Sequence, residues 1–141
     1  MQGQIQRIVN DVSATAWTPT QYLEAINAAI VRVAEIMEKK SDADLLYTMA
    51  INSGDLIPEY FIRFAGTYPV QQENGRFICG ATLTAKYYRM PSQIVALADT
   101  IDFRSRKSLE AIKLASAIYL KEQRGTFDMK NEKERLAELL A

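Results

Sequence analysis

The sequence predicts a mainly α fold: a four-helix, bundle-like domain with a small antiparallel β-hairpin unit inserted between the two pairs of helices. Apolar residues recur at helical spacing near both ends of the chain, which predicts the helices. Short apolar runs separated by turn-forming residues fill the middle, which predicts strands. The length suits one domain, 1–141. We expect helices at about 2–13, 19–39, 103–123 and 127–140, and the β unit at about 45–89.

The start of the second helix carries the clearest local signal. The Thr18 hydroxyl can cap the helix, and Pro19 then falls at the first helical position, where its missing N–H costs nothing. Gln21 can reach back to complete a capping box. Trp17 before the cap and Tyr22 after it are placed to form a hydrophobic staple. These residues predict a helix that begins at Pro19.

The middle of the chain predicts an antiparallel unit that turns at an Asn-Gly pair. Asn74 and Gly75 both tolerate the positive φ of a type I′ turn, so the segments on either side of them are expected to form a hairpin. Its exposed tip would consist of Glu73, Asn74, Gly75 and Arg76. Strands are expected at about 45–51, 61–72, 76–79 and 82–89.

Composition argues against several functional classes. The 17 basic and 17 acidic residues cancel, which disfavours a protein that coats nucleic acid or an anionic membrane and favours self-association. The chain has no histidine, so the commonest general base and metal ligand near neutral pH are missing. Cys79 is the single cysteine and is expected to be a small packing residue. We therefore expect a protein that is not an enzyme and needs no cofactor.

Targeting signals are absent from the pattern. No apolar run approaches the roughly 20 residues that a membrane helix needs. The N-terminus lacks the basic-then-apolar order of a signal peptide. This predicts a cytosolic protein with no membrane partner.

Four acidic residues could suggest a cation site: Asp42, Asp44, Asp55 and Glu59. Their spacings match no calcium loop, so no metal is expected.

A basic cluster stands at the expected start of the third helix. It consists of Arg104, Arg106 and Lys107. Cations at a helix N-terminus are unfavourable, because that end already carries partial positive charge. The cluster therefore indicates either a contact with an acidic partner or with DNA, or a solvated turn that Asp99 and Asp102 neutralise.

Two neighbouring tyrosines and an arginine, Tyr87, Tyr88 and Arg89, allow two interpretations. Aromatic rings beside a cation can form a stacking platform for nucleic acid. Successive residues of a strand point to opposite faces, however, so the favoured interpretation places one ring in the core and one on the surface.

The last helix has a narrow apolar face, and residues of alternating charge lie between its apolar positions in the sequence. Such a thin stripe is typical either of a peripheral helix laid on the bundle or of a helix that docks on a neighbouring subunit or partner. The residues of this stripe are Phe127, Met129, Leu136, Leu139 and Leu140, and Lys133 and Arg135 lie among the charges between them.

Three segments carry a family resemblance. Trp17 to Leu23 (WTPTQYL) is similar to a recurring tryptophan and small polar residue that open a leucine-containing helix, and Asn27 follows one turn on. Ile57 to Arg63 (IPEYFIR) resembles a Leu-Pro-x-x-Phe turn into a strand. Ala85 to Pro91 (AKYYRMP) resembles a Tyr-Tyr-x-x-Pro strand end before a long helix. In this order they resemble the head-to-tail adaptor (connector, or head-completion) proteins of tailed bacteriophages.

The resemblance implies a structural virion protein, assembled in the host cytoplasm and located in the head–tail neck. It implies a ring, expected to be a dodecamer, that binds the portal and meets a tail or head-completion protein. DNA would be cargo that passes the channel. The C-terminal segment would contact the portal, and the β unit, with the tip Glu73, Asn74, Gly75 and Arg76, would face the tail side or the lumen. The candidate portal or subunit interface is Arg104, Arg106, Lys107, Phe127, Met129, Lys133, Arg135, Leu136, Leu139 and Leu140.

An alternative function stays open beside this one. A small nucleic-acid-binding regulatory protein could use the helix pair and the Arg104–Lys107 cluster. The balanced charge weighs against this alternative, because nucleic-acid binding depends on an excess of basic residues.

Overall fold

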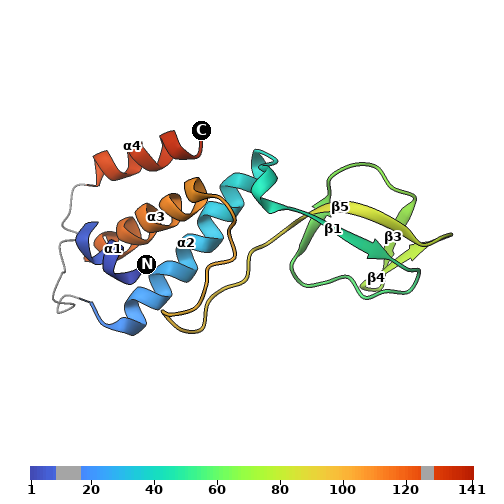
Figure 1. Ribbon diagram of the computed structural model, residues 1–141, viewed down its shortest axis with the longest axis horizontal. Helices are drawn as coiled ribbons and strands as arrows, with labels where there is room; N and C mark the ends of the chain where they lie inside the picture. The colour runs from blue at the N-terminus through green and yellow to red at the C-terminus, as the bar shows by residue number, and fades with distance from the viewer. Residues whose placement is uncertain (9–16, 125–128) are drawn as a thin grey trace.

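The computed structural model describes residues 1–8, 17–124 and 129–141. The described chain is elongated, with the helices gathered at one end and the strands at the other (Figure 1). We call these the helical half and the β half. The helices are α1 (Gln2–Ile8), α2 (Pro19–Lys39), α3 (Arg106–Arg124) and α4 (Lys130–Leu139), and a short 3-10 turn, η1 (Ala43–Leu45), follows α2. The strands are β1 (Leu46–Ile51), β2 (Phe61–Phe64), β3 (Val70–Glu73), β4 (Arg76–Cys79) and β5 (Leu83–Arg89).

The expectation of a mainly α fold is wrong, because the chain is an α+β mixture. The β half is more than a small hairpin unit: it holds a three-stranded antiparallel sheet, in the order β1-β5-β2, and a separate two-stranded hairpin, β3-β4. The expected single strand 61–72 is broken at 65–69, where Gly66 and Pro69 interrupt it. The two pieces then belong to different sheets.

The Asn-Gly turn of the β3–β4 hairpin is confirmed. Asn74 and Gly75 have φ values of 50° and 73°, the left-handed geometry that a type I′ turn requires. The other edge of β4 is paired too, because the Ile57 N–H donates to the Gly75 carbonyl (2.9 Å) and the Phe77 N–H donates to the Asp55 carbonyl (2.8 Å). The chain before β2 therefore extends the hairpin on its β4 side.

Helix α2 begins as expected. The Gln21 N–H donates to the Thr18 hydroxyl at 3.2 Å, and the Thr18 N–H donates to the Gln21 side-chain oxygen at 2.8 Å, which completes the capping box. Pro19 is the first residue of the helix. The Trp17 ring meets the Tyr22 ring edge-on, with centroids 6.4 Å apart, and both are buried. The hydrophobic staple is therefore confirmed.

The other helices differ from expectation at their ends. Helix α3 begins at Arg106, three residues after its expected start, because the Ser105 hydroxyl accepts the Ser108 N–H at 3.1 Å and caps the helix there. It ends at Arg124, one residue beyond expectation. The expected extensions of the first helix over 9–13 and of the last helix over 127–128 lie outside the described residues.

The main hydrophobic core lies in the helical half. Helices α2 and α3 form its centre through residues such as Ile30 and Ile112, which are fully buried. Ile5 of α1 and Leu136 of α4 pack onto it from outside this pair, and Tyr88 of β5 reaches it from the sheet. All four helices therefore contribute to one core, as the sequence predicts.

A second, smaller core lies in the β half. Its fully buried members are Ile51, Phe77 and Ala85. Phe61 and Phe64 pack against Phe77 with ring centroids 5.3 and 5.6 Å apart, and against each other at 5.0 Å. Aromatic contacts therefore join the three-stranded sheet to the β3–β4 hairpin.

Candidate interaction surface

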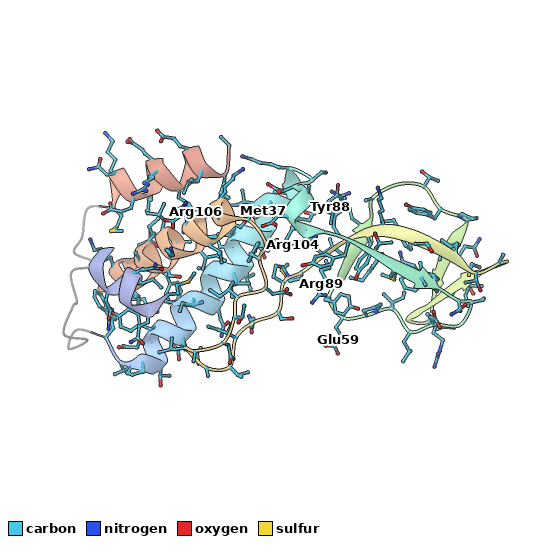
Figure 2. The ribbon with its side chains drawn as sticks, viewed as in Figure 1. Met37, Glu59, Tyr88, Arg89, Arg104 and Arg106 are labelled. Carbon is cyan, nitrogen blue, oxygen red and sulfur yellow. The ribbon has the colours of Figure 1, made fainter. Side chains whose placement is uncertain are left out.

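Two arginines and two tyrosines form an alternating stack where the two halves meet. The Arg104 guanidinium carbon lies 4.3 Å from the centroid of the Tyr47 ring. The Arg89 guanidinium carbon lies 4.9 Å from the same ring and 4.4 Å from the ring of Tyr60. Figure 2 labels both arginines in this region, between the helices and the sheet. We call Tyr47, Tyr60, Arg89 and Arg104 the Arg–Tyr stack.

Three separate parts of the chain position the stack. Tyr47 of β1 lies opposite Tyr87 in the pairing of β1 with β5, and Arg89 ends β5. Tyr60 directly precedes β2, whose first residue pairs with Arg89. Arg104 arrives from the segment before α3, and its guanidinium donates to the Leu46 carbonyl at the start of β1. The sheet register therefore brings together side chains that lie far apart in the sequence.

The two arginines differ in their charge balance. The Arg89 guanidinium pairs with Asp102 at 3.1 Å, and its buried Nε makes no hydrogen bond. Arg104 stays exposed, and none of the six ion pairs among the described residues includes Arg104 or Arg106. Tyr60 is 40% exposed, so the stack reaches the surface. The surface combines uncompensated positive charge with an accessible aromatic ring.

The positive charge at the start of α3 is balanced by Asp44 and Asp42, and not by the expected Asp99 and Asp102. The Ser105 hydroxyl donates to an Asp44 carboxylate oxygen at 3.1 Å, and the Ser108 hydroxyl donates to the same oxygen. This carboxylate lies at the helix N-terminus, where negative charge is favourable. Lys107 pairs with Asp42 at 3.9 Å.

Asp99 and Asp102 therefore do not neutralise the basic cluster in the way that the solvated-turn interpretation requires. Asp102 pairs with Arg89, and Asp99 accepts the Val95 and Ala96 N–H groups at 2.9 and 3.0 Å. Of the three clustered cations, Lys107 has an acidic partner while Arg104 and Arg106 face outward.

Tyr87 and Tyr88 are both buried, at 4% and 8% exposure, so the expectation of one core ring and one surface ring is wrong. The end of β5 lies between the two cores, and each face of the strand is covered. Tyr88 joins the main core beneath Arg63, whose guanidinium carbon lies 4.3 Å from its ring centroid. Tyr87 stacks on Phe61 at 5.9 Å, and burial raises its pKa above the ordinary value. Neither ring forms an exposed platform.

Sequence reasoning missed the two tyrosines that do stack with arginine, Tyr47 and Tyr60. Tyr47 lies within the expected strand 45–51, and Tyr60 lies within the Ile57–Arg63 segment that resembles a turn into a strand. Only the pairing of β1 and β2 with the central strand β5 brings them beside Arg89. No local spacing in the sequence signals that pairing.

The apolar residues of α4 belong to the core of this chain. Met129, Leu136 and Leu140 are between 3% and 4% exposed, and Leu139 is partly buried. This arrangement agrees with the peripheral-helix interpretation, and it leaves those three side chains unavailable as an interface surface. Phe127 lies outside the described residues.

The charged candidates on α4 are exposed. Lys133 pairs with Glu122 of α3 at 2.6 Å, which fastens α4 to its neighbour. Arg135 is exposed. A hydrogen bond from Lys113 is the main cause that lowers the pKa of Glu110, and the charges of Arg106 and Arg135 lower it further. The exposed sides of α4 therefore remain available to a partner.

The hairpin tip is exposed throughout. Glu73, Asn74, Gly75 and Arg76 are all accessible, although the Arg76 guanidinium also donates to the Gly54 carbonyl at 2.7 Å. The proposed lumen- or tail-facing role of this tip stays a prediction.

A hollow of about 570 Å³ lies between α1, α2, α3 and the segment before α3. Its lining includes Ile94, Ile101, Phe103 and Lys113.

Within the described ranges, no three potential metal-ligating side chains come together. No helix of those ranges is both long and apolar enough to cross a membrane.

Comparison with protein-family models, with curated proteins and with solved structures finds no match for this chain.

Proposed function

We propose that the protein acts by binding, as a structural adaptor that forms a ring on a bacteriophage portal and lengthens the DNA channel toward the tail. In this proposal the chain carries out no chemical step and needs no cofactor. The portal, a tail or head-completion protein and further copies of the same chain are its partners. Its place of action would be the neck of the virion.

The observation that carries the binding role is the Arg–Tyr stack. Tyrosine and arginine are the residues that most often dominate the binding energy of protein interfaces, together with tryptophan. Stacking on Tyr47 and Tyr60 holds the guanidinium groups of Arg104 and Arg89 in place before any partner arrives. These two arginines therefore lose less side-chain entropy when a partner binds than free arginines would.

The ring and the portal are supported by the three segments that resemble the adaptor family. Trp17 and its staple open helix α2, Pro58 lies in the turn before β2, and Pro91 follows β5. Each of these residues therefore lies beside the end of a helix or strand.

A nucleic-acid-binding regulatory role is the second candidate, favoured by one observation. Tyr60 is 40% exposed next to Arg89, and Arg104 and Arg106 have no acidic partner among the ion pairs of the described residues. A stacked base and a phosphate could both find contacts there. The zero net charge favours the adaptor instead, because nonspecific attraction to DNA depends on an excess of cations.

The test is assembly with a purified portal ring from the same genome. We expect the protein to bind the portal and to show a ring of the same symmetry by electron microscopy. The double variant Arg104→Ala/Arg106→Ala should bind less, and Arg32→Ala/Lys86→Ala, which removes two exposed cations elsewhere, should bind as the wild type does. A protein that ignores the portal but binds duplex DNA with a steep salt dependence would reject the adaptor and favour the regulator.

A further inference from the structure

Two exposed arginines, one just before α3 and one at its first residue, take part in none of the ion pairs among the described residues, and we call them the basic face (Arg104 and Arg106). Arg104 keeps guanidinium N–H groups free beyond the one that it donates to Leu46, and Arg106 is exposed on the first turn of α3. Figure 2 labels Arg106 at the helices and Arg104 between the helices and the sheet. Guanidinium groups bind carboxylates through paired, charge-assisted hydrogen bonds, so a surface with two carboxylates would suit them.

Such a pair of carboxylates exists on α4. Glu134 and Glu138 are exposed and one helical turn apart, so they share a side of the helix. Leu136 and Leu140 face the core, which directs the two glutamates outward. None of the six ion pairs among the described residues includes either glutamate. We call Glu134 and Glu138 the acidic ridge.

Charge balance favours a second copy of this chain as the partner. The 17 cations and 17 anions cancel, and every internal ion pair removes one of each. A positive excess at one place on the molecule is therefore matched by a negative excess elsewhere on the same molecule. Nonspecific attraction to DNA grows with an excess of cations, and the net charge of this chain is zero.

We propose that the basic face of one copy binds the acidic ridge of α4 on the next copy. This inference rests on the proposed ring assembly and specifies one contact within it. The two surfaces lie on different elements, the basic face at the start of α3 and the acidic ridge on α4, which forms an outer edge of the helical half (Figure 1). A contact between unlike surfaces, repeated from copy to copy, closes a ring when the rotation fits.

Charge reversal tests this contact in both directions. One variant is Arg104→Glu/Arg106→Glu, and the other is Glu134→Arg/Glu138→Arg. Each variant places like charges opposite each other, so each alone should associate about tenfold or more weakly than the wild type. A one-to-one mixture should regain association, because every contact then joins opposite charges again. Sedimentation velocity over a dilution series, at low and at high salt, measures the association.

Two controls separate the contact from other effects. Arg32→Glu/Lys86→Glu changes the net charge as much as the basic-face variant does and should associate as the wild type does. Because Arg104 also stacks on Tyr47, Arg106→Glu alone repeats the test without disturbing the stack. Circular dichroism checks that each variant is folded.

The inference is overturned if the wild type stays monomeric at every concentration, if the charge-reversed variants associate as it does, or if the mixture fails to recover. Loss of duplex DNA binding in the basic-face variant, with association unchanged, would also overturn it and assign the basic face to nucleic acid. If the wild type binds the portal and the charge-reversed variants self-associate as the wild type does, this contact is rejected but the adaptor proposal stands. A wild type that binds no portal would reject the adaptor whatever its self-association.

Discussion

At the scale of single residues, Trp17 shows how one side chain fixes the start of a helix. Its ring is 4% exposed and lies edge-on to Tyr22, within the main core. Trp17→Ala should lower the free energy of unfolding by about 3–5 kcal/mol, because it removes a large buried ring and leaves a cavity. Urea unfolding measures the change. Val95→Ala is the control, since Val95 is 85% exposed and its loss should change stability by about 0.5 kcal/mol or less.

If Trp17→Ala unfolds at the same urea concentration as the wild type, the ring contributes little to the core. The staple contact would then contribute little to the free energy of unfolding, and Trp17 would be reassigned to an interface with a partner.

Tyr87 predicts how stability responds to alkaline pH. Burial, followed by a hydrogen bond with Tyr60, raises the pKa of Tyr87 above its ordinary value of 10.0. The unfolded chain releases this proton near the ordinary pKa, while the folded chain still holds it. The stabilising contribution is therefore complete below that pH and is lost as the pH rises above it.

Tyr87→Phe has no proton to lose, so it should show a smaller fall in unfolding free energy between about pH 9 and about pH 11 than the wild type does. Urea unfolding at each pH measures both slopes. Equal slopes would mean that Tyr87 is as free to ionise in the folded chain as in the unfolded one.

Residue-level features could be predicted from the sequence where their partners are neighbours. Thr18 and Gln21 form the capping box because they are three residues apart, and Asn74 with Gly75 makes its turn alone. The Arg–Tyr stack could not be predicted in this way. Its members come from β1, the segment before β2, the end of β5 and the segment before α3, and only the sheet pairing brings them together.

At the scale of elements, prediction succeeded best for α2 and least for the segment 61–72. The cap and the repeated apolar face of α2 are local signals, and its bounds match. The segment 61–72 has β-forming residues at both ends, so its composition favours one strand. The break at 65–69 separates a long-range pairing, β2 with β5, from the local β3–β4 hairpin, and composition does not indicate the long-range pairing. Gly66 and Pro69 were the local signal for it.

Helix α4 gives the prediction that belongs to this scale. Leu136 is 3% exposed and packs in the main core, so Leu136→Ala should cost about 2–5 kcal/mol of unfolding free energy. Asn131→Ala, at an exposed position of the same helix, should cost far less. Thermal and urea unfolding of the two variants provide the comparison. A small loss for Leu136→Ala would show that α4 is weakly attached and that its apolar side could serve a partner instead.

At the scale of the whole molecule, the expected α class failed because the strand pairings are long-range. The helices contribute to one core, as expected, but the β half forms a second core of its own around Ile51, Phe77 and Ala85. Periodicity along the sequence indicates which residues of a strand share a face. It does not indicate that the last strand, β5, lies between the first two. That order is what turns a hairpin unit into a sheet with its own aromatic core.

The unequal size of the two cores predicts how the molecule opens. The β core has only three fully buried members among the described residues, too few for independent stability, whereas the main core draws on all four helices. Tyr88 of β5 and Leu45 beside β1 belong to the main core, so the three-stranded sheet is joined to the helices. The hairpin β3–β4 has no such member. Local opening should therefore start at the hairpin.

Native-state hydrogen exchange measures this order. We expect the amides of β3 and β4 to exchange through a low-energy local opening, and those of α2, α3 and β5 to exchange only near the free energy of global unfolding. Far-ultraviolet and near-ultraviolet circular dichroism should give one coincident urea transition, because the sheet shares core residues with the helices. Two separated transitions, or β5 amides that exchange as fast as those of β3, would contradict this. The β half would then be an independent unit, held to the helices by the Arg–Tyr stack and the connecting chain more than by a shared core.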